Sequence, residues 1–193
     1  MAGFVLFGHS FVKRLKNKHG CIYDVQLQRS KCSITCLGEV GLTVRRIQKN
    51  PSRYFQQLRE LHPTVLIIDL GTNDLCSAEV TPHQVHASLC EMVRDLRIWD
   101  VYPEAVVFLP VLPRTGGLRG YQVSLEVFNK RVLDFNMLLE SSTFLEDRLW
   151  VWHHRGIKHP RLNLDGVHLN KQGMLLYERT LRQLLKFFEF RIW

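Results

Sequence analysis

Short apolar runs alternate along the chain with longer stretches in which apolar residues recur at helical spacing. The short runs are nearly continuous in apolar character, which is typical of strands buried on both faces. Strands are predicted at residues 4–7, 32–37, 65–70, 105–109 and 149–152. Helices are predicted between and after them, at residues 11–19, 43–61, 82–99, 123–139 and 170–187.

Individual residues mark where some of these helices begin and end. Ser10 is expected to cap the N-terminus of the first helix, and Gly20 is expected to follow its last turn. Pro51 is expected to divide the stretch 43–61 into two helices, because proline lacks the backbone N–H that a helix interior needs. The regular alternation of strand and helix predicts a parallel sheet with helices on both of its faces.

Length and composition agree with a single domain spanning residues 1–193. The chain is long enough for one α/β domain and too short for two. Its apolar share of 46% and charged share of 23% exclude intrinsic disorder and a fibrous protein. No run approaches the roughly 18 consecutive apolar residues of a membrane span, and the N-terminus lacks a signal peptide's basic segment. Because the first apolar run starts almost at once, we expect a domain excised from a longer protein.

The cysteines are five in number, so they cannot all pair within the chain. No two of them have the C-x-x-C spacing that zinc ribbons use. We therefore expect reduced thiols and an intracellular, cytoplasmic location. The cysteines are Cys21, Cys32, Cys36, Cys76 and Cys90.

Polar residues follow the first strand at the edge of the sheet where α/β proteins bind their ligands. Gly8-His9-Ser10 stands at this strand-to-helix turn. A serine there has an accessible hydroxyl, and its backbone N–H lies at the positive end of a helix. Ser10 is therefore a candidate nucleophile, with a plain helix cap as the alternative.

Three further polar segments follow later strands. Segment 38–43 contains Gly38 and Gly41, which let the backbone approach a ligand, and segment 71–74 contains Asn73, a neutral hydrogen-bond donor. Asp165 and His168 stand three apart on one loop, so the carboxylate can orient the imidazole. Each segment alone is also a plausible turn. Together the four supply a nucleophile, a base, an orienting acid and oxyanion donors, which is the set needed for acyl transfer.

These four blocks resemble those of the SGNH (GDSL-type) hydrolases over residues 4 to 177. The resemblance implies a flavodoxin-like three-layer α/β/α sandwich around a five-stranded parallel sheet. It also implies that Ser10 is the nucleophile, His168 the general base and Asp165 the residue that orients His168. The implied oxyanion hole consists of the backbone N–H groups of Ser10 and Gly41 and the side-chain amide of Asn73. We expect neither a metal nor a cofactor at this site.

One residue departs from the family pattern. The first block is usually G-D-S, and His9 replaces its aspartate here. The resulting G-H-S-F sequence and a basic first helix also resemble the esterase domain of the first reading frame of some non-LTR retrotransposons. Few residues remain for a lid, and the irregular loop 110–121 is short. We therefore expect an esterase with an open site that hydrolyses short-chain acyl esters, acetyl or lipid-derived.

Two basic stretches support an alternative function. With its formal net charge of +8, the chain could be a weakened module of a retroelement protein that binds RNA or anionic lipid. Solvated helix faces are the simpler explanation, and binding would be weak and sensitive to salt. The basic stretches contain Lys13, Arg14, Lys16, Lys18 and His19, then Arg45, Arg46, Lys49 and Arg53.

The remaining candidate features are a set of histidines, Cys76 and the aromatic C-terminal tail. The histidines of two stretches could bind zinc, but no H-E-x-x-H or cysteine-rich pattern supports a zinc site, so exposed loop histidines are the favoured interpretation apart from His168. Cys76 is expected to be a buried thiol. The aromatic tail 187–193 is expected to end a core helix at Phe187 and Phe188, while Ile192 and Trp193 could contact a membrane or a second copy of the chain. The histidines are His83 and His86, then His153, His154, His159 and His168.

Overall fold

The computed structural model describes residues 3–26, 31–118, 121, 123–143, 147–154 and 165–191. The strands are β1 (Phe4–Gly8), β2 (Ile22–Gln26), β3 (Lys31–Gly38), β4 (Val65–Asp69), β5 (Ala105–Phe108) and β6 (Leu149–Val151). The helices are α1 (Ser10–His19), α2 (Val44–Lys49), α3 (Pro51–Leu61), α4 (Pro82–Asp95), α5 (Leu125–Ser142) and α6 (Lys171–Glu189). Two short 3-10 helices are η1 (Asp74–Cys76) and η2 (Leu96–Trp99).

The strands form one sheet in the order β2-β3-β1-β4-β5-β6. The five strands β3, β1, β4, β5 and β6 are parallel, as predicted. β2 is an additional edge strand that pairs antiparallel with β3. The sequence pattern did not predict β2, because its run is short and is interrupted by the polar residues Asp24 and Gln26.

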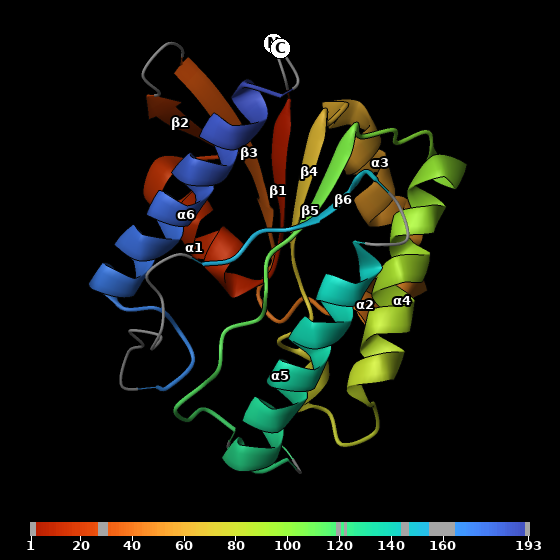
Figure 1. Cartoon of the computed structure of the whole chain (residues 1–193), viewed down its shortest axis with the longest axis vertical. Helices are drawn as coiled ribbons and strands as arrows, with labels where there is room; N and C mark the ends of the chain where they lie inside the picture. The colour runs from red at the N-terminus through yellow and green to blue at the C-terminus, as the bar shows by residue number, and fades with distance from the viewer. Residues whose placement is uncertain are drawn as a thin grey trace.

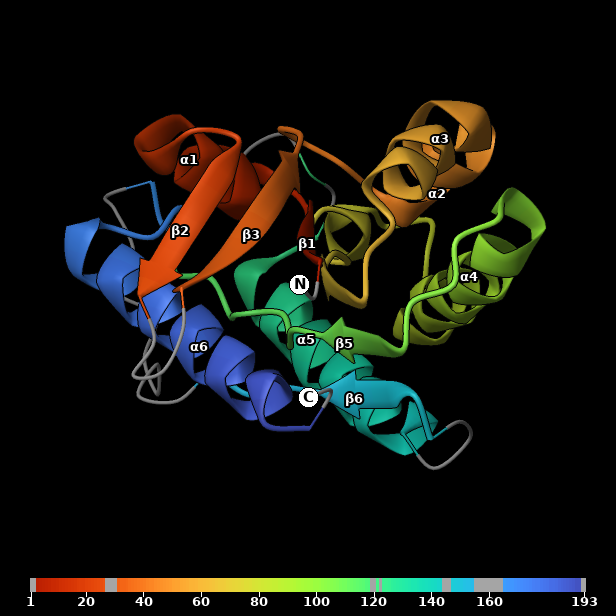
Figure 2. The same ribbon diagram turned by 90° about the horizontal axis from the view of Figure 1, so that it is seen from above.

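Helices cover the two faces of the sheet, which gives the expected three-layer α/β/α sandwich (Figure 1). One apolar core lies between the sheet and the side that carries α2, α3, α4 and α5. A second core lies between the sheet and α1 with α6, and it includes Phe188 with Phe187 packed against it. Seen from above, α1 and α6 lie on one side and α2, α3 and α4 on the other (Figure 2).

The register brings the carboxyl ends of three strands together. Gly8 at the end of β1 pairs with Gly38 of β3 on one side and with Asp69 of β4 on the other. A Cβ atom on Gly38 would lie 2.2 Å from the backbone nitrogen of Lys13, and no side chain fits in so little space. The start of α1 therefore rests directly on the end of β3, and the turn before it holds Ser10 at this edge.

The helix boundaries confirm most of the sequence prediction and correct one part of it. Gly20 ends α1 with a positive φ of 88°, and α3 begins at Pro51 immediately after Asn50. Ser10 was predicted to be the N-cap of α1, and this is wrong. The N-cap is His9, whose Nδ1 atom accepts the backbone N–H of Phe11, so Ser10 is the first residue of the helix.

No helix among the described residues is long and apolar enough to cross a membrane. None of the five cysteines, all of which lie in the described residues, forms a disulfide bond, and Cys76 is buried as expected. Ile192 and Trp193, the two residues considered for membrane or self-contact, lie outside the described residues.

Candidate active site

Ser10 lies at the edge of the sheet where β1 ends. It is 9% exposed and begins α1, so its backbone N–H lies in the first turn of a helix. Its Oγ atom lies 3.4 Å from Nδ1 of His9. The predicted nucleophile therefore lies at the positive end of a helix dipole, but it is largely buried and not, as the sequence suggested, openly accessible.

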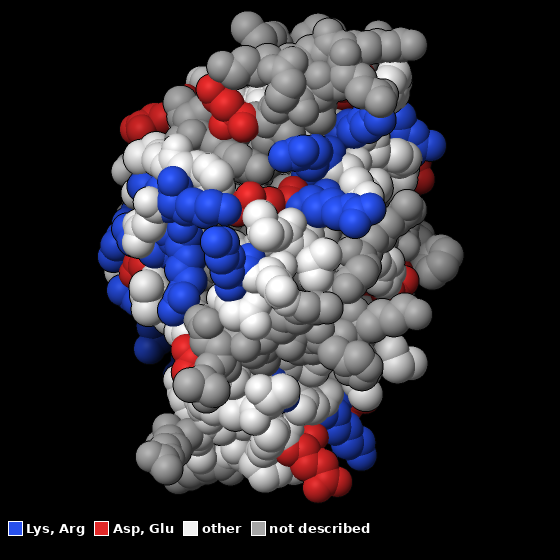
Figure 3. Space-filling view, turned by 90° about the vertical axis from the view of Figure 1, so that its left-hand side faces the viewer, with Lys and Arg blue, Asp and Glu red and all other residues white. Residues whose placement is uncertain are grey.

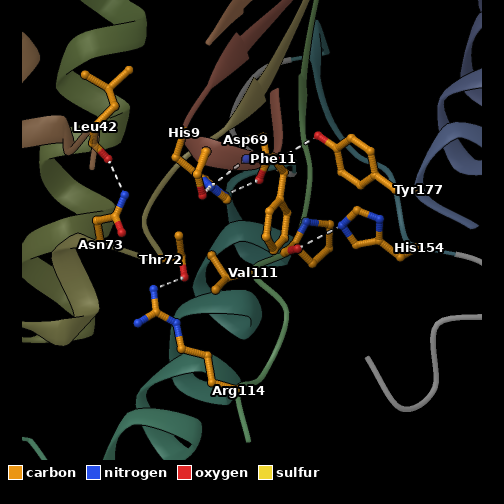
Figure 4. A network of polar contacts seen from close by, with 12 residues as sticks. His9, Phe11, Leu42, Asp69, Thr72, Asn73, Val111, Arg114, His154 and Tyr177 are labelled. Atoms are coloured by element: carbon orange, nitrogen blue, oxygen red, sulfur yellow. Dashed lines mark hydrogen bonds and ion pairs between the residues drawn. The ribbon is translucent and has the colours of Figure 1, made fainter. Parts of the chain in front are cut away.

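Buried polar contacts join His9 to Asp69 and Asp69 to Tyr177 (Figure 4). Nε2 of His9 lies 3.1 Å from Oδ1 of Asp69, and the hydroxyl of Tyr177 donates to Oδ2 of Asp69 over 2.6 Å. Since Nδ1 of His9 accepts the N–H of Phe11, the proton of a neutral imidazole is on Nε2 and is donated to Asp69. The histidine that replaces the family's aspartate is thus satisfied on both ring nitrogens.

The charge states of these polar side chains follow from their burial and from their hydrogen-bond partners. Burial alone would raise the pKa of Asp69, but the electrostatic effect of His9 and the hydrogen bonds from His9 and Tyr177 outweigh it and hold that pKa below its ordinary value. Burial and the neighbouring carboxylate raise the pKa of Tyr177, which therefore remains a donor. The ring of His154 stacks on Tyr177, and burial lowers the pKa of His154.

Asp165 and His168 are paired, as the sequence suggested. Oδ2 of Asp165 lies 2.7 Å from Nδ1 of His168, and its Oδ1 accepts the backbone N–H groups of Val167 and His168 over 2.9 Å each. Partial burial tends to raise the pKa of Asp165, but these backbone hydrogen bonds and the imidazole lower it to about 2. The pairing at Nδ1 leaves Nε2 of His168 for another partner.

The loop that carries this pair adjoins the cavity of Ser10. Ser10 and Val167 line the same cavity of about 10 Å³, which has room for about one water molecule. The carbonyl of Gly166 accepts the backbone N–H of Thr115, which fixes the loop against the segment after β5. Within the described residues no hydrogen bond joins Ser10 to His168, since the side-chain contact of Ser10 is with His9.

Segments 38–43 and 71–74, which with Ser10 are predicted to supply the oxyanion hole, are joined by a hydrogen bond. The side-chain amide of Asn73 donates to the carbonyl of Leu42 over 2.9 Å, and Gly41 beside it has a positive φ of 69°. The carboxylate of Asp74 accepts the backbone N–H of Val44 at the start of α2 over 3.0 Å. Burial raises the pKa of Asp74 to about 6, although these backbone bonds oppose the shift.

Sequence reasoning missed a buried cation beside Ser10. Arg114 is 7% exposed and lines the same cavity. Its guanidinium donates to the hydroxyl of Thr72 over 3.2 Å and to Sγ of Cys76 over 3.0 Å, and it lies over the ring of Phe128. Nothing in the sequence singled out Arg114, because it stands in an irregular loop.

Sequence reasoning also missed the partners of His9, although it left one clue. Asp69 is the only charged residue in the otherwise apolar run 65–70, and a buried carboxylate needs a partner. The partner could not be named because His9 and Tyr177 are distant from Asp69 in sequence.

The histidines weighed as zinc ligands do not form a metal cluster in the part of the chain that the structure describes. No group there contains three or more His, Cys, Asp or Glu side chains able to hold a metal ion. Nε2 of His86 contacts the hydroxyl of Ser142, and Nε2 of His153 pairs with Glu140. His159 lies outside the described residues.

The parallel sheet and its two helical layers give the chain a three-layer α/β/α fold. Three similar solved structures have this fold. An acetyl esterase mutant with an acetate ion has a TM-score of 0.69 and 16% identity, with 100% of both chains covered. A GDSL-like lipase from Bacteroides thetaiotaomicron has a TM-score of 0.68 and 16% identity, covering 95% of this chain and 87% of that one.

A putative acylhydrolase from Bacteroides fragilis has a TM-score of 0.67 and 17% identity, covering 95% of this chain and 86% of that one. No protein-family model and no curated protein matches the sequence. At these low identities the likeness shows the shared fold alone.

Proposed function

We propose that this protein is a serine esterase that hydrolyses short-chain acyl esters through Ser10, His168 and Asp165. The observation that supports the proposal is that Val167, the residue next to His168, lines the same cavity as Ser10. Ser10 begins α1, the paired Asp165 and His168 stand on a loop that adjoins its cavity, and Asn73 is bonded to the loop of Gly41. The named activities of the similar structures, esterase and acylhydrolase, support the same reaction class.

In the proposed mechanism the Ser10 hydroxyl turns from His9 toward Nε2 of His168, which takes its proton as Oγ attacks the ester carbonyl. Asp165 holds the imidazole through Nδ1 and stabilises the imidazolium that forms. The backbone N–H groups of Ser10 and Gly41 and the amide of Asn73 donate to the oxyanion. His168 then protonates the leaving alcohol, and water hydrolyses the acyl-enzyme by the same steps.

The small cavity supports a short acyl group. Among the described residues, the space beside Ser10 holds about one water molecule, so it is narrower than the open site expected from the sequence and offers no pocket to a long acyl chain. Leu112 and Pro113 line this space together with Val167, which makes part of its wall apolar. We therefore propose acetyl esters as the preferred substrates among esters of one alcohol.

Hydrolysis of p-nitrophenyl esters tests the proposal. The wild type is expected to hydrolyse the acetate faster than the octanoate, and Ser10→Ala is expected to reduce the rate to background. Ser33→Ala, which removes an exposed hydroxyl from β3, is the matched control and should leave the rate unchanged. Equal rates for wild type and Ser10→Ala would contradict the proposal.

A second candidate function is a module that binds RNA or anionic lipid without catalysis, as part of a retroelement protein. The specific observation in its favour is the gathering of Lys and Arg side chains on the side of the molecule that carries α1 and α6 (Figure 3). Exposed basic residues of these helices include Arg14 and Lys18 of α1 and Arg179 and Arg182 of α6. Salt-sensitive binding without any esterase activity would favour this second function.

A further inference from the structure

A second, larger cavity lies between α1 and α3, beside the loop that follows β3. Its volume is about 400 Å³, which falls within the range of small-molecule sites. Lys13 and Lys16 of α1 line one side, and Arg53 and Tyr54 of α3 line the other. Leu37 and Leu42 contribute an apolar surface, so the cavity combines cationic walls with an apolar part.

The positive charge of this cavity is only partly balanced. Its one carboxylate, Glu39, is already bonded to Arg53 over 3.0 Å, to Arg46 over 2.6 Å and to the hydroxyl of Tyr54 over 3.3 Å. Lys13 and Lys16 have no carboxylate partner within the described residues. Three cations therefore face one cavity that holds a single, shared negative charge.

The two lysines also repel each other. They stand three residues apart on α1, which places their side chains on one face of the helix, and both are half-buried. Like charges at this spacing destabilise a helix, and partial burial strengthens the repulsion because it removes screening water. An anion bound between them would relieve this repulsion.

We propose that this cavity binds the phosphate group of a phosphate monoester. A phosphate carries between one and two negative charges at neutral pH and has several acceptor oxygens, which match the ammonium groups of Lys13 and Lys16 and the guanidinium of Arg53. The apolar surface accommodates the carbon part of the ester. The phosphate can belong to a soluble ester or to a lipid headgroup.

The size and place of the cavity favour one phosphate ester over an extended polyanion. A concave space of this volume accommodates a single small group, whereas a polymer would contact a long basic surface. Leu42, which lines the cavity, accepts the hydrogen bond of Asn73, so the site lies behind the proposed oxyanion loop. Binding there does not rest on the proposed esterase activity.

Calorimetric titration of the full chain with glycerol 3-phosphate, at constant ionic strength, tests this site. The Ser10→Ala variant serves as the host, so that the result is independent of catalysis. We expect saturable 1:1 binding and a rise in the melting temperature with ligand concentration. Adding Lys13→Gln and Lys16→Gln should weaken binding about tenfold or more, because each change removes a charge-assisted hydrogen bond.

Lys130→Gln is the matched control, since Lys130 is an exposed lysine on α5 and its loss should leave the affinity unchanged. Without ligand, the Lys13→Gln/Lys16→Gln variant should melt no lower than its host, because the repulsion is gone. Vesicles of phosphatidylcholine with phosphatidic acid distinguish the source of the phosphate. Vesicle binding that the double variant loses assigns a lipid headgroup, and binding of the soluble ester alone assigns a soluble ligand.

Two results would overturn the proposal. One is a response to chloride equal to that of glycerol 3-phosphate at the same ionic strength. The other is the same affinity in the double variant and in its host.

Discussion

Asn73 donates one of its two side-chain amide protons to the carbonyl of Leu42, and in the proposed mechanism the other contacts the substrate oxygen. Replacing Asn73 by alanine is expected to lower kcat by about 10²–10³, because one donor to the oxyanion is lost. KM for p-nitrophenyl acetate should change little, since this donor acts mainly in the transition state. Steady-state kinetics of the purified variant measure both values. A kcat within about threefold of wild type would exclude Asn73 from the oxyanion hole.

His9 and Asp69 depend on each other because both are buried. The change His9→Asp restores the family's G-D-S sequence but places a second carboxylate against Asp69. Two buried like charges are costly, so the variant is expected to lose about 3 kcal/mol or more of unfolding free energy at neutral pH. His9→Asn keeps a neutral side chain and should lose less. Urea denaturation of the two variants compares them, and equal stability would contradict this role of His9.

Asp74 makes stability depend on pH. Its raised pKa of about 6 means that the folded state holds this proton more tightly than the unfolded state. The wild type should therefore lose stability relative to Asp74→Asn as pH rises from about 4 to about 6, by roughly 3 kcal/mol at 1.36 kcal/mol per pKa unit. Asparagine keeps an oxygen for the N–H of Val44, so the variant is a fair reference. A stability difference that stays constant from pH 4 to 7 would contradict the shift.

The residues of the site could be named from the sequence only where a motif brings them together. Asp165 and His168 are three residues apart, and their hydrogen bond could be anticipated from spacing alone. The contact between His9 and Asp69 spans 60 residues, and the one between Asp69 and Tyr177 spans 108. Such contacts follow from strand register, which one sequence does not reveal.

At the scale of single elements, the close contact between α1 and β3 depends on Gly38. A methyl group there would meet the backbone of Lys13, so Gly38→Ala should displace α1 and lower the unfolding free energy by about 3 kcal/mol or more. Gly20→Ala is the control. Its Cβ would meet no atom within 4 Å, and only its positive φ is strained, so a loss of about 1 kcal/mol is expected. Similar losses in both variants would contradict the proposed close contact.

The strands of the parallel sheet could be predicted because strands buried on both faces are continuously apolar. β4 and β5 match the predicted runs to within one residue at either end. β2 could not be predicted, because an edge strand has fewer buried positions and its apolar pattern is weak. The first helix was predicted correctly, but its cap was assigned to Ser10 because serine is a common N-cap and histidine is not.

At the scale of the whole molecule, many of the basic residues behind the net charge of +8 lie on the side that carries α1 and α6. Arg14 and Lys18 of α1 and Arg179 and Arg182 of α6 face solvent on this side, whereas Lys13 and Lys16 are half-buried. Lys18 pairs with Glu178 of α6 over 2.5 Å. This exposed basic side differs from the small cavity of Ser10, which is lined by both polar and apolar residues. The basic surface and the proposed chemistry can therefore be tested separately.

Covalent labelling of Ser10 tests the central claim most directly. The wild type is incubated with a fluorophosphonate, which reacts with activated serines, and the modified peptide is identified by mass spectrometry. We predict a single adduct on Ser10, formed much more slowly in His168→Ala because the general base is missing. No adduct on Ser10 in folded wild-type protein, or an equal labelling rate in His168→Ala, would contradict the assignment of Ser10 and His168 as nucleophile and base.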